Sequence, residues 1–193
     1  MPDNDVAFIP GNGYIKRSES KLFVNVGTDD APEWELQGDR NEELSHELNP
    51  NVESGEDVTG ATYADLDKYE EETDVETYRA RRESKWAAIL YNIIKYRKTL
   101  TDVVHQFLIV NTFAGADGAY DAWVQKAVVA VQSHAGDTKG MNMPYNIHWT
   151  GERIHGTFNL ETLTFTPNDA AVAPEAQTLR ATAGTTTKAS DKA

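Results

Sequence analysis

Apolar and polar residues alternate with a period of two in several segments of the chain, a pattern that predicts β-strands. Residues 21–27 alternate in this way, and a turn signal follows at 29–32. Residues 33–37 form a plausible return strand, with Trp34 and Leu36 on one face. The pattern therefore predicts that a hairpin opens the folded part of the chain.

The second half of the chain is predicted to be almost entirely strand. Residues 101–113 are apolar on both faces, as expected of a central strand that is covered on each side. Residues 123–132 follow a glycine-containing turn and are predicted to return antiparallel to them. Residues 145–150 predict a further strand, residues 154–166 a closing hairpin, and the alternation at 74–79 an earlier strand.

One helix is predicted, over residues 84–96, where apolar side chains recur at helical spacing. Ser84 is a suitable N-cap, and basic residues lie near the C-terminal end, where the helix dipole favours cations. We expect the helix to cover a sheet with an apolar face that consists of Trp86, Ile89, Leu90 and Ile93.

Residues 39–74 are dense in Asp and Glu and poor in residues that form a core. Asn49-Pro50-Asn51 and Ser54-Gly55 interrupt the short strand pieces that its few apolar residues would supply, so the segment predicts a long excursion from the main body. The alternative is an acidic loop that is merely solvated. The chain is thus divided into a leader (1–20), a β domain (21–167) that contains the excursion, and a flexible polar tail (168–193).

Length and composition limit the possible functions. The 193 residues suit one domain with tails, and the formal net charge of −13 disfavours binding to phosphate backbones, which depends on Lys and Arg. The chain has no cysteine, which excludes disulfides, thiolate nucleophiles and Cys-type zinc sites. Because neither a signal peptide nor a bilayer-spanning apolar stretch is recognisable, we expect no membrane association.

The sequence offers few candidates for a reactive or metal-binding site. His148, Glu152 and His155 flank a predicted turn, but their spacing matches no zinc signature, and polar positions of a hairpin explain them better. Asp65 and Asp67 begin a calcium-loop pattern that Tyr69 then breaks. No motif for a nucleophile of acyl transfer is present. We therefore expect a protein that is not an enzyme and has no metal or cofactor.

The order of the predicted elements resembles that of a known family. An opening hairpin, a long acidic excursion, one amphipathic helix and a set of antiparallel strands that ends in a hairpin resemble the major tail proteins, or tail tube proteins, of long-tailed, siphovirus-like bacteriophages. The resemblance covers residues 14–167 and is carried by Trp34-Glu35-Leu36-Gln37-Gly38, residues 44–58 with Leu48-Asn49-Pro50-Asn51-Val52, the helix at 84–96, Ile154-His155-Gly156-Thr157-Phe158, and Thr164-Phe165-Thr166-Pro167.

This resemblance implies a mainly β fold with one flanking α-helix, an antiparallel β-sandwich or rolled sheet of the phage tail tube type. It implies a virion protein, made in the host bacterial cytoplasm, whose hexameric rings stack into a tube that double-stranded DNA traverses without specific binding. Tape measure, tail terminator and distal tail proteins would be its partners. The family places an arm for contacts between subunits in the acidic excursion, which assigns to assembly Leu44, Leu48, Asn49, Pro50, Val52, Val58, Tyr63 and Tyr69.

Two alternatives remain open at the level of sequence. One is the inner tube protein of a contractile tail or injection system, which would need a sheath partner. The other is a monomeric β-sandwich that binds or cleaves carbohydrate. The latter predicts exposed Trp side chains arranged as a platform, whereas all four Trp residues fit apolar faces: Trp34, Trp86, Trp123 and Trp149.

Overall fold

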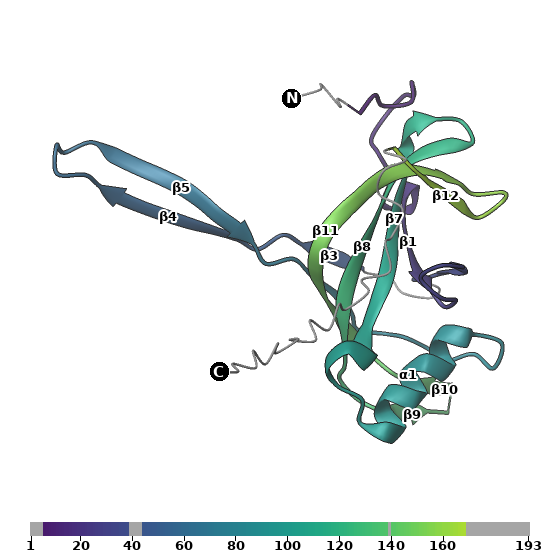
Figure 1. Ribbon diagram of the computed structural model, residues 1–193. Coiled ribbons are helices and arrows are strands. Elements are labelled where there is room, and N and C mark those ends of the chain that lie inside the picture. The colour runs from purple at the N-terminus through teal and green to yellow at the C-terminus, as the bar shows by residue number, and fades with distance from the viewer. Residues whose placement is uncertain (1–5, 39–43, 139, 169–193) are drawn as a thin grey trace, which may run out of the picture.

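The computed structural model describes residues 6–38, 44–138 and 140–168. Over these residues the protein is mainly β, with one eight-stranded antiparallel sheet, two sheets of two strands and one α-helix (Figure 1). The elements in chain order are η1 (Arg17–Glu19), β1 (Ser20–Asn25), β2 (Trp34–Leu36), β3 (Ser45–Glu47), β4 (Pro50–Glu56), β5 (Thr62–Tyr69), β6 (Glu72–Val75), α1 (Lys85–Tyr96), η2 (Leu100–Val103), β7 (Val104–Ala116), β8 (Ala119–Val131), β9 (Ala135–Asp137), β10 (Gly140–Asn142), β11 (Tyr145–Asn159) and β12 (Thr164–Pro167).

The main sheet has the strand order β2-β1-β7-β8-β11-β6-β3, and β12 pairs with β11. Its long middle strands bury side chains on both faces, as the run over 101–113 predicts. Phe107 and Ile109 belong to one hydrophobic cluster and Leu108 and Val110 to another. Successive side chains of a strand point to opposite faces, so β7 contributes to the core on both sides of the sheet.

The helix α1 matches its prediction and covers one of these two clusters. The Ser84 side chain caps it by accepting a hydrogen bond from the Ala87 backbone N–H. Glu35 of β2 adds a second cap, because its carboxylate accepts hydrogen bonds from Ser84 Oγ and from the Trp86 backbone N–H. The helix start is therefore tied to an edge strand of the sheet.

Several predicted elements have different bounds in the structure. The strand predicted over 101–113 is β7, which starts at Val104 because residues 100–103 form η2, and the strand predicted over 123–132 is β8, which starts at Ala119. The closing hairpin predicted over 154–166 forms, with the end of β11 paired to β12. Its first strand is not separate from residues 145–150, since β11 runs without a break from Tyr145 to Asn159 and accommodates residues 151–153 as an irregularity in its pairing with β8. The strand predicted over 74–79 is β6 (Glu72–Val75). The chain leaves the sheet after β6 because the Tyr78 backbone pairs with the segment around β10, through Asn142 and Met143.

The acidic excursion is more regular than its turn residues suggest. Pro50 begins β4, a position where a strand tolerates a missing N–H, and β4 continues through Ser54 and Gly55 to pair with β5. The Tyr63 ring lies over Gly55. A Cβ atom at position 55 would be only 2.7 Å from the Tyr63 hydroxyl oxygen, so glycine leaves room for the ring. An aromatic side chain thus covers the glycine and supports the strand. Residues 1–5, 39–43 and the tail after 168 lie outside the described residues.

Candidate functional site

A two-stranded arm, formed by β4 and β5 with their turn, projects from the body of the molecule (Figure 1). Apart from Gly55, every residue in the two strands is exposed. A two-stranded hairpin with no further packing is only marginally stable in water. The arm is therefore the part of the described fold that gains most from contact with another molecule.

The arm carries exposed apolar side chains. Those of Val52, Val58, Tyr63, Leu66 and Tyr69 are between 48% and 106% exposed, and Leu48, just before β4, is 45% exposed. Val52 pairs directly with Leu66 across the two strands, so these two side chains lie on one face of the arm. Leu66 is not among the arm residues assigned from the sequence. Its position between Asp65 and Asp67 is the apolar–polar alternation of a strand, which could have identified it. Leu44, which was assigned, lies before β3 and packs against the core of the body.

The turn at the tip of the arm is held by a side chain. Asp57 accepts hydrogen bonds from the backbone N–H groups of Thr59 and Ala61 and from the Thr59 hydroxyl. These hydrogen bonds, first of all the one from the Thr59 hydroxyl, lower the pKa of Asp57 below its ordinary value. The tip consequently keeps its negative charge and presents a fully exposed Val58 in an ordered turn.

The root of the arm is anchored in the main sheet. Its two strands continue from β3 and β6, which pair with each other at the sheet edge. Asn49 takes a left-handed backbone conformation with φ of 42°, which Asn tolerates better than most residues, and its carbonyl accepts a hydrogen bond from the Glu70 N–H. Asn49 and Pro50, assigned from sequence, thus shape the point where the arm leaves the body.

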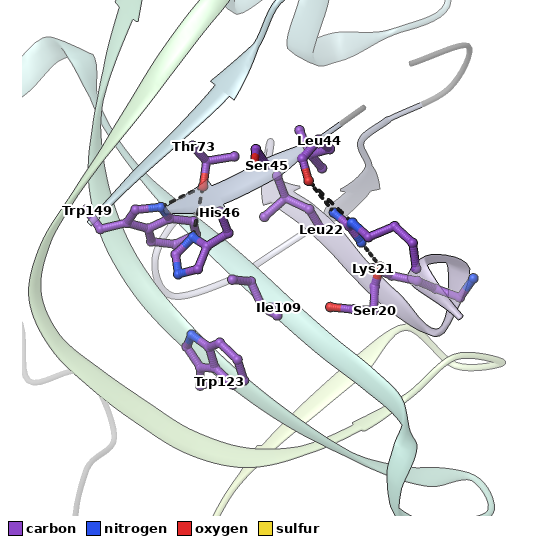
Figure 2. A pocket seen from close by; sticks show the side chains of 11 residues that line it. Ser20, Lys21, Leu22, Leu44, Ser45, His46, Thr73, Ile109, Trp123 and Trp149 are labelled. Atoms are coloured by element: carbon purple, nitrogen blue, oxygen red, sulfur yellow. Dashed lines mark hydrogen bonds between the residues drawn. The ribbon is translucent and has the colours of Figure 1, made fainter. Parts of the chain in front are cut away.

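A pocket of about 370 Å³ lies on the sheet beside this root (Figure 2). Its walls come from strands far apart in the sheet order, including Leu22 of β1, the second strand from one end, and His46 of β3 at the other end. The sheet is therefore rolled, and Arg17 links β1 to the segment before β3 by donating hydrogen bonds to the carbonyls of Ser20 and Leu44. Ile109, Trp123 and Trp149 supply the apolar lining.

The polar groups of the pocket hold β3 and β6 in place. Thr73 Oγ1 accepts a hydrogen bond from Trp149 Nε1 at 3.0 Å and lies 2.9 Å from His46 Nδ1. When the hydroxyl donates to Nδ1, the imidazole proton is on Nε2, which lies 3.7 Å from a carboxylate oxygen of Glu71. Glu71 also forms an ion pair with Arg153 of β11. This network connects the root of the arm to the middle of the sheet.

Burial is the largest influence on His46 and lowers its pKa, with smaller lowering contributions from the Arg153 and Arg17 charges. The negative charge of Glu71 acts in the opposite direction. His105 on β7 also has a lowered pKa, because it is buried beside the Trp86 ring and near Lys98. Both imidazoles are therefore held in their neutral form at neutral pH.

The residues considered for metal binding do not converge. His148, Glu152 and His155 all lie on the one strand β11, and no cluster of three or more His, Asp or Glu suited to a metal occurs among the residues that the structure describes.

The residues expected on the apolar face of the helix point into the body. Trp86, Leu90 and Ile93 are buried, and Ile89 packs against the cluster that contains Trp86 and Leu90. None of the four Trp side chains forms an exposed platform.

None of the helices in the described part of the chain is long and apolar enough to cross a membrane. In comparisons with known proteins, no family model matches the chain, and no curated protein matches it.

Proposed function

We propose that this protein is a structural subunit that assembles with copies of itself into the hollow tail tube of a long-tailed bacteriophage. The projecting β4–β5 arm carries the proposal. It extends an acidic, partly apolar surface beyond the body, where nothing in the described part of the same copy packs on its apolar residues. An element of this kind has a physical purpose when a neighbouring subunit covers it.

The edges of the main sheet support the same proposal. Within the described residues the strand order ends with β2 on one side and β3 on the other, and each presents backbone groups that another chain can pair with. Contacts from one edge to the opposite edge of the next copy are head-to-tail contacts, which generate a ring when the rotation closes. Six copies in each ring, stacked rings and an aqueous channel complete the proposed tube.

The charge of the chain suits a channel for DNA. At a formal net charge of −13, carboxylates that face the lumen repel phosphates and let the genome pass without adhering. In this proposal the protein is not an enzyme and needs no cofactor. Its partners are further copies of itself and the tape measure, tail terminator and distal tail proteins of the virion, into which it is assembled in the host cytoplasm.

Negative-stain electron microscopy of the purified, concentrated chain tests the proposal. We expect rings or hollow tubes of uniform width. Failure of assembly over a broad range of salt and protein concentration, with a purified tail initiation complex of the phage present, would refute it. A tube that binds a co-expressed sheath protein on its outside would instead assign the chain to a contractile system.

A further inference from the structure

Charge of opposite sign is concentrated in two segments of this acidic chain. Residues 79–98, which include α1, carry seven basic side chains and a single acid, Glu83: the bases are Arg79, Arg81, Arg82, Lys85, Lys95, Arg97 and Lys98. Residues 47–76, which include the arm, carry eleven acids and one base, Lys68: the acids are Glu47, Glu53, Glu56, Asp57, Asp65, Asp67, Glu70, Glu71, Glu72, Asp74 and Glu76. The arm projects away from α1, so a single molecule cannot bring the two together (Figure 1).

A groove of about 580 Å³ lies at the end of the basic segment, between the C-terminal end of α1, η2 and the last residues of β8. Ile93 and Val103 give it an apolar floor, and Arg97 and Lys98 line it with positive charge. Leu100, also in the lining, is 84% exposed. The groove therefore suits a ligand that is both acidic and apolar.

The backbone beside this groove is strained. Arg97 and Leu100 have φ angles of 48° and 58°, in the left-handed region that glycine occupies without penalty. Arg97 is the C-cap of α1, a place where Gly is the usual residue. The sequence thus keeps a cation and a large apolar side chain at two positions where glycine would stabilise the fold. Left-handed residues other than glycine occur at turns and helix ends, as at Asn49 and Leu163 in this chain, and also at binding sites.

The arm has the complementary chemistry. Glu53 and Asp65 are directly opposite each other on β4 and β5, and two like charges in this arrangement destabilise a hairpin unless cations approach them. Val58 at the tip is fully exposed beside Asp57, whose hydrogen bonds keep it ionised. An acidic hairpin with an apolar tip matches a basic groove with an apolar floor in both charge and polarity.

We propose that the groove formed by α1, η2 and the end of β8 receives the β4–β5 arm of a second copy of this chain, with the tip entering first. This inference rests on the self-assembly proposed above and identifies the surface that accepts the arm. The contact joins two different surfaces, the arm of one copy and the groove of another. A copy whose arm is docked still has its own groove available for the arm of a third copy, so the assembly propagates.

A cross-linking experiment tests the contact directly, because the chain has no cysteine of its own. The variant Val58→Cys/Leu100→Cys is oxidised under assembly conditions and run on a non-reducing gel. We expect a ladder of covalent oligomers that a reductant collapses to monomer. The control is Val58→Cys/Lys16→Cys, which has one thiol outside the groove and should give at most a faint ladder. Equal ladders from the two variants would overturn the inference.

Charge exchange gives a second test. Arg97→Glu/Lys98→Glu reverses the groove, and Glu53→Lys/Glu56→Lys reverses the arm at two exposed positions. By sedimentation velocity we expect each variant alone to self-associate at least tenfold more weakly than the unmodified chain, and a mixture of the two to recover association. The control Lys16→Glu/Lys21→Glu makes the same change in net charge outside the groove and outside the basic segment, and it should associate like the unmodified chain. A mixture that stays dissociated would contradict docking of arm on groove.

A glycine substitution separates docking from folding. Arg97→Gly relieves the backbone strain, so we expect the denaturation midpoint of the monomer to rise while self-association weakens. A more stable variant that assembles normally would show that the Arg97 side chain is not part of the contact.

If the groove variants assemble into normal tubes, the groove assignment is wrong and the tube proposal stands. If the unmodified chain never assembles, the tube proposal itself fails.

Discussion

At the scale of single residues, the arm depends on a few polar side chains at its root. The Thr73 hydroxyl accepts a hydrogen bond from the indole N–H of Trp149 and is hydrogen-bonded to His46. Glu71 forms an ion pair with Arg153. These contacts join β3 and β6 to β11. Removing one member of such a network leaves its buried partners without hydrogen bonds, which is why network residues affect stability more than their size suggests.

The lowered pKa of His46 predicts how stability depends on pH. Burial makes the folded protein bind a proton less readily at His46 than the unfolded chain does, and the same holds for His105. The free energy of unfolding should therefore be fully maintained above the ordinary histidine pKa of about 6.5 and fall as the pH decreases below it.

Urea unfolding of the monomer at pH 7.5 and pH 5.5 measures this dependence. We expect His46→Asn/His105→Asn to lose less stability between the two pH values than the unmodified chain. The two proteins should have the same pH dependence between pH 7.5 and 8.5, where both imidazoles are neutral in either state. An equal loss on acidification would show that neither histidine contributes.

At the scale of elements, the arm is separable from the body. Its strands pair with each other, while the hydrophobic clusters draw on the main sheet and α1. Val52 and Leu66 are opposite each other, so a tight turn placed after this pair leaves the root of the hairpin in place.

Replacing residues 53–65 by Asn-Gly should therefore change the free energy of unfolding by less than about 1 kcal/mol, because no buried residue is removed. The same change should abolish self-assembly. Chemical denaturation and electron microscopy on one preparation measure both effects. A shortened chain that still forms tubes would show that the arm is not required for assembly. An unfolded shortened chain would show that the body requires the arm in order to fold.

At the scale of the whole molecule, the net charge of −13 opposes association of copies. The Debye length is about 30 Å at 10 mM salt and about 8 Å at 150 mM, so repulsion between whole subunits is largely screened at the higher value. Charge pairs that become buried in a contact are screened much less.

Self-association should consequently strengthen as NaCl rises from about 10 mM to about 150 mM, although the proposed docking is electrostatic in part. Sedimentation velocity at several protein concentrations measures this change. A steady weakening of association over this range would mean that exposed charge pairs dominate the contact. Sodium sulfate at equal ionic strength provides a comparison, since sulfate also favours apolar burial.

The local pattern of the sequence was sufficient to predict the helix, its Ser84 cap and the strands that became β1, β7 and β8. These elements depend on side-chain periodicity and on capping within a few residues, which a linear sequence displays directly. The acidic excursion could be located for the same reason, because its composition differs from that of its neighbours. Its role in assembly stays a prediction, as does the tail tube fold type.

The tertiary structure decided what depends on residues far apart in the chain. Pairing with β8 on both sides of residues 151–153 keeps β11 one strand across this irregularity, and Tyr63 over Gly55 lets the excursion form a two-stranded arm. Rolling of the sheet brings His46 near Leu22 in one pocket, and the groove combines the end of α1 with the end of β8. Periodicity specifies which face of an element is apolar, whereas partner and register follow from packing and pairing between segments distant in sequence.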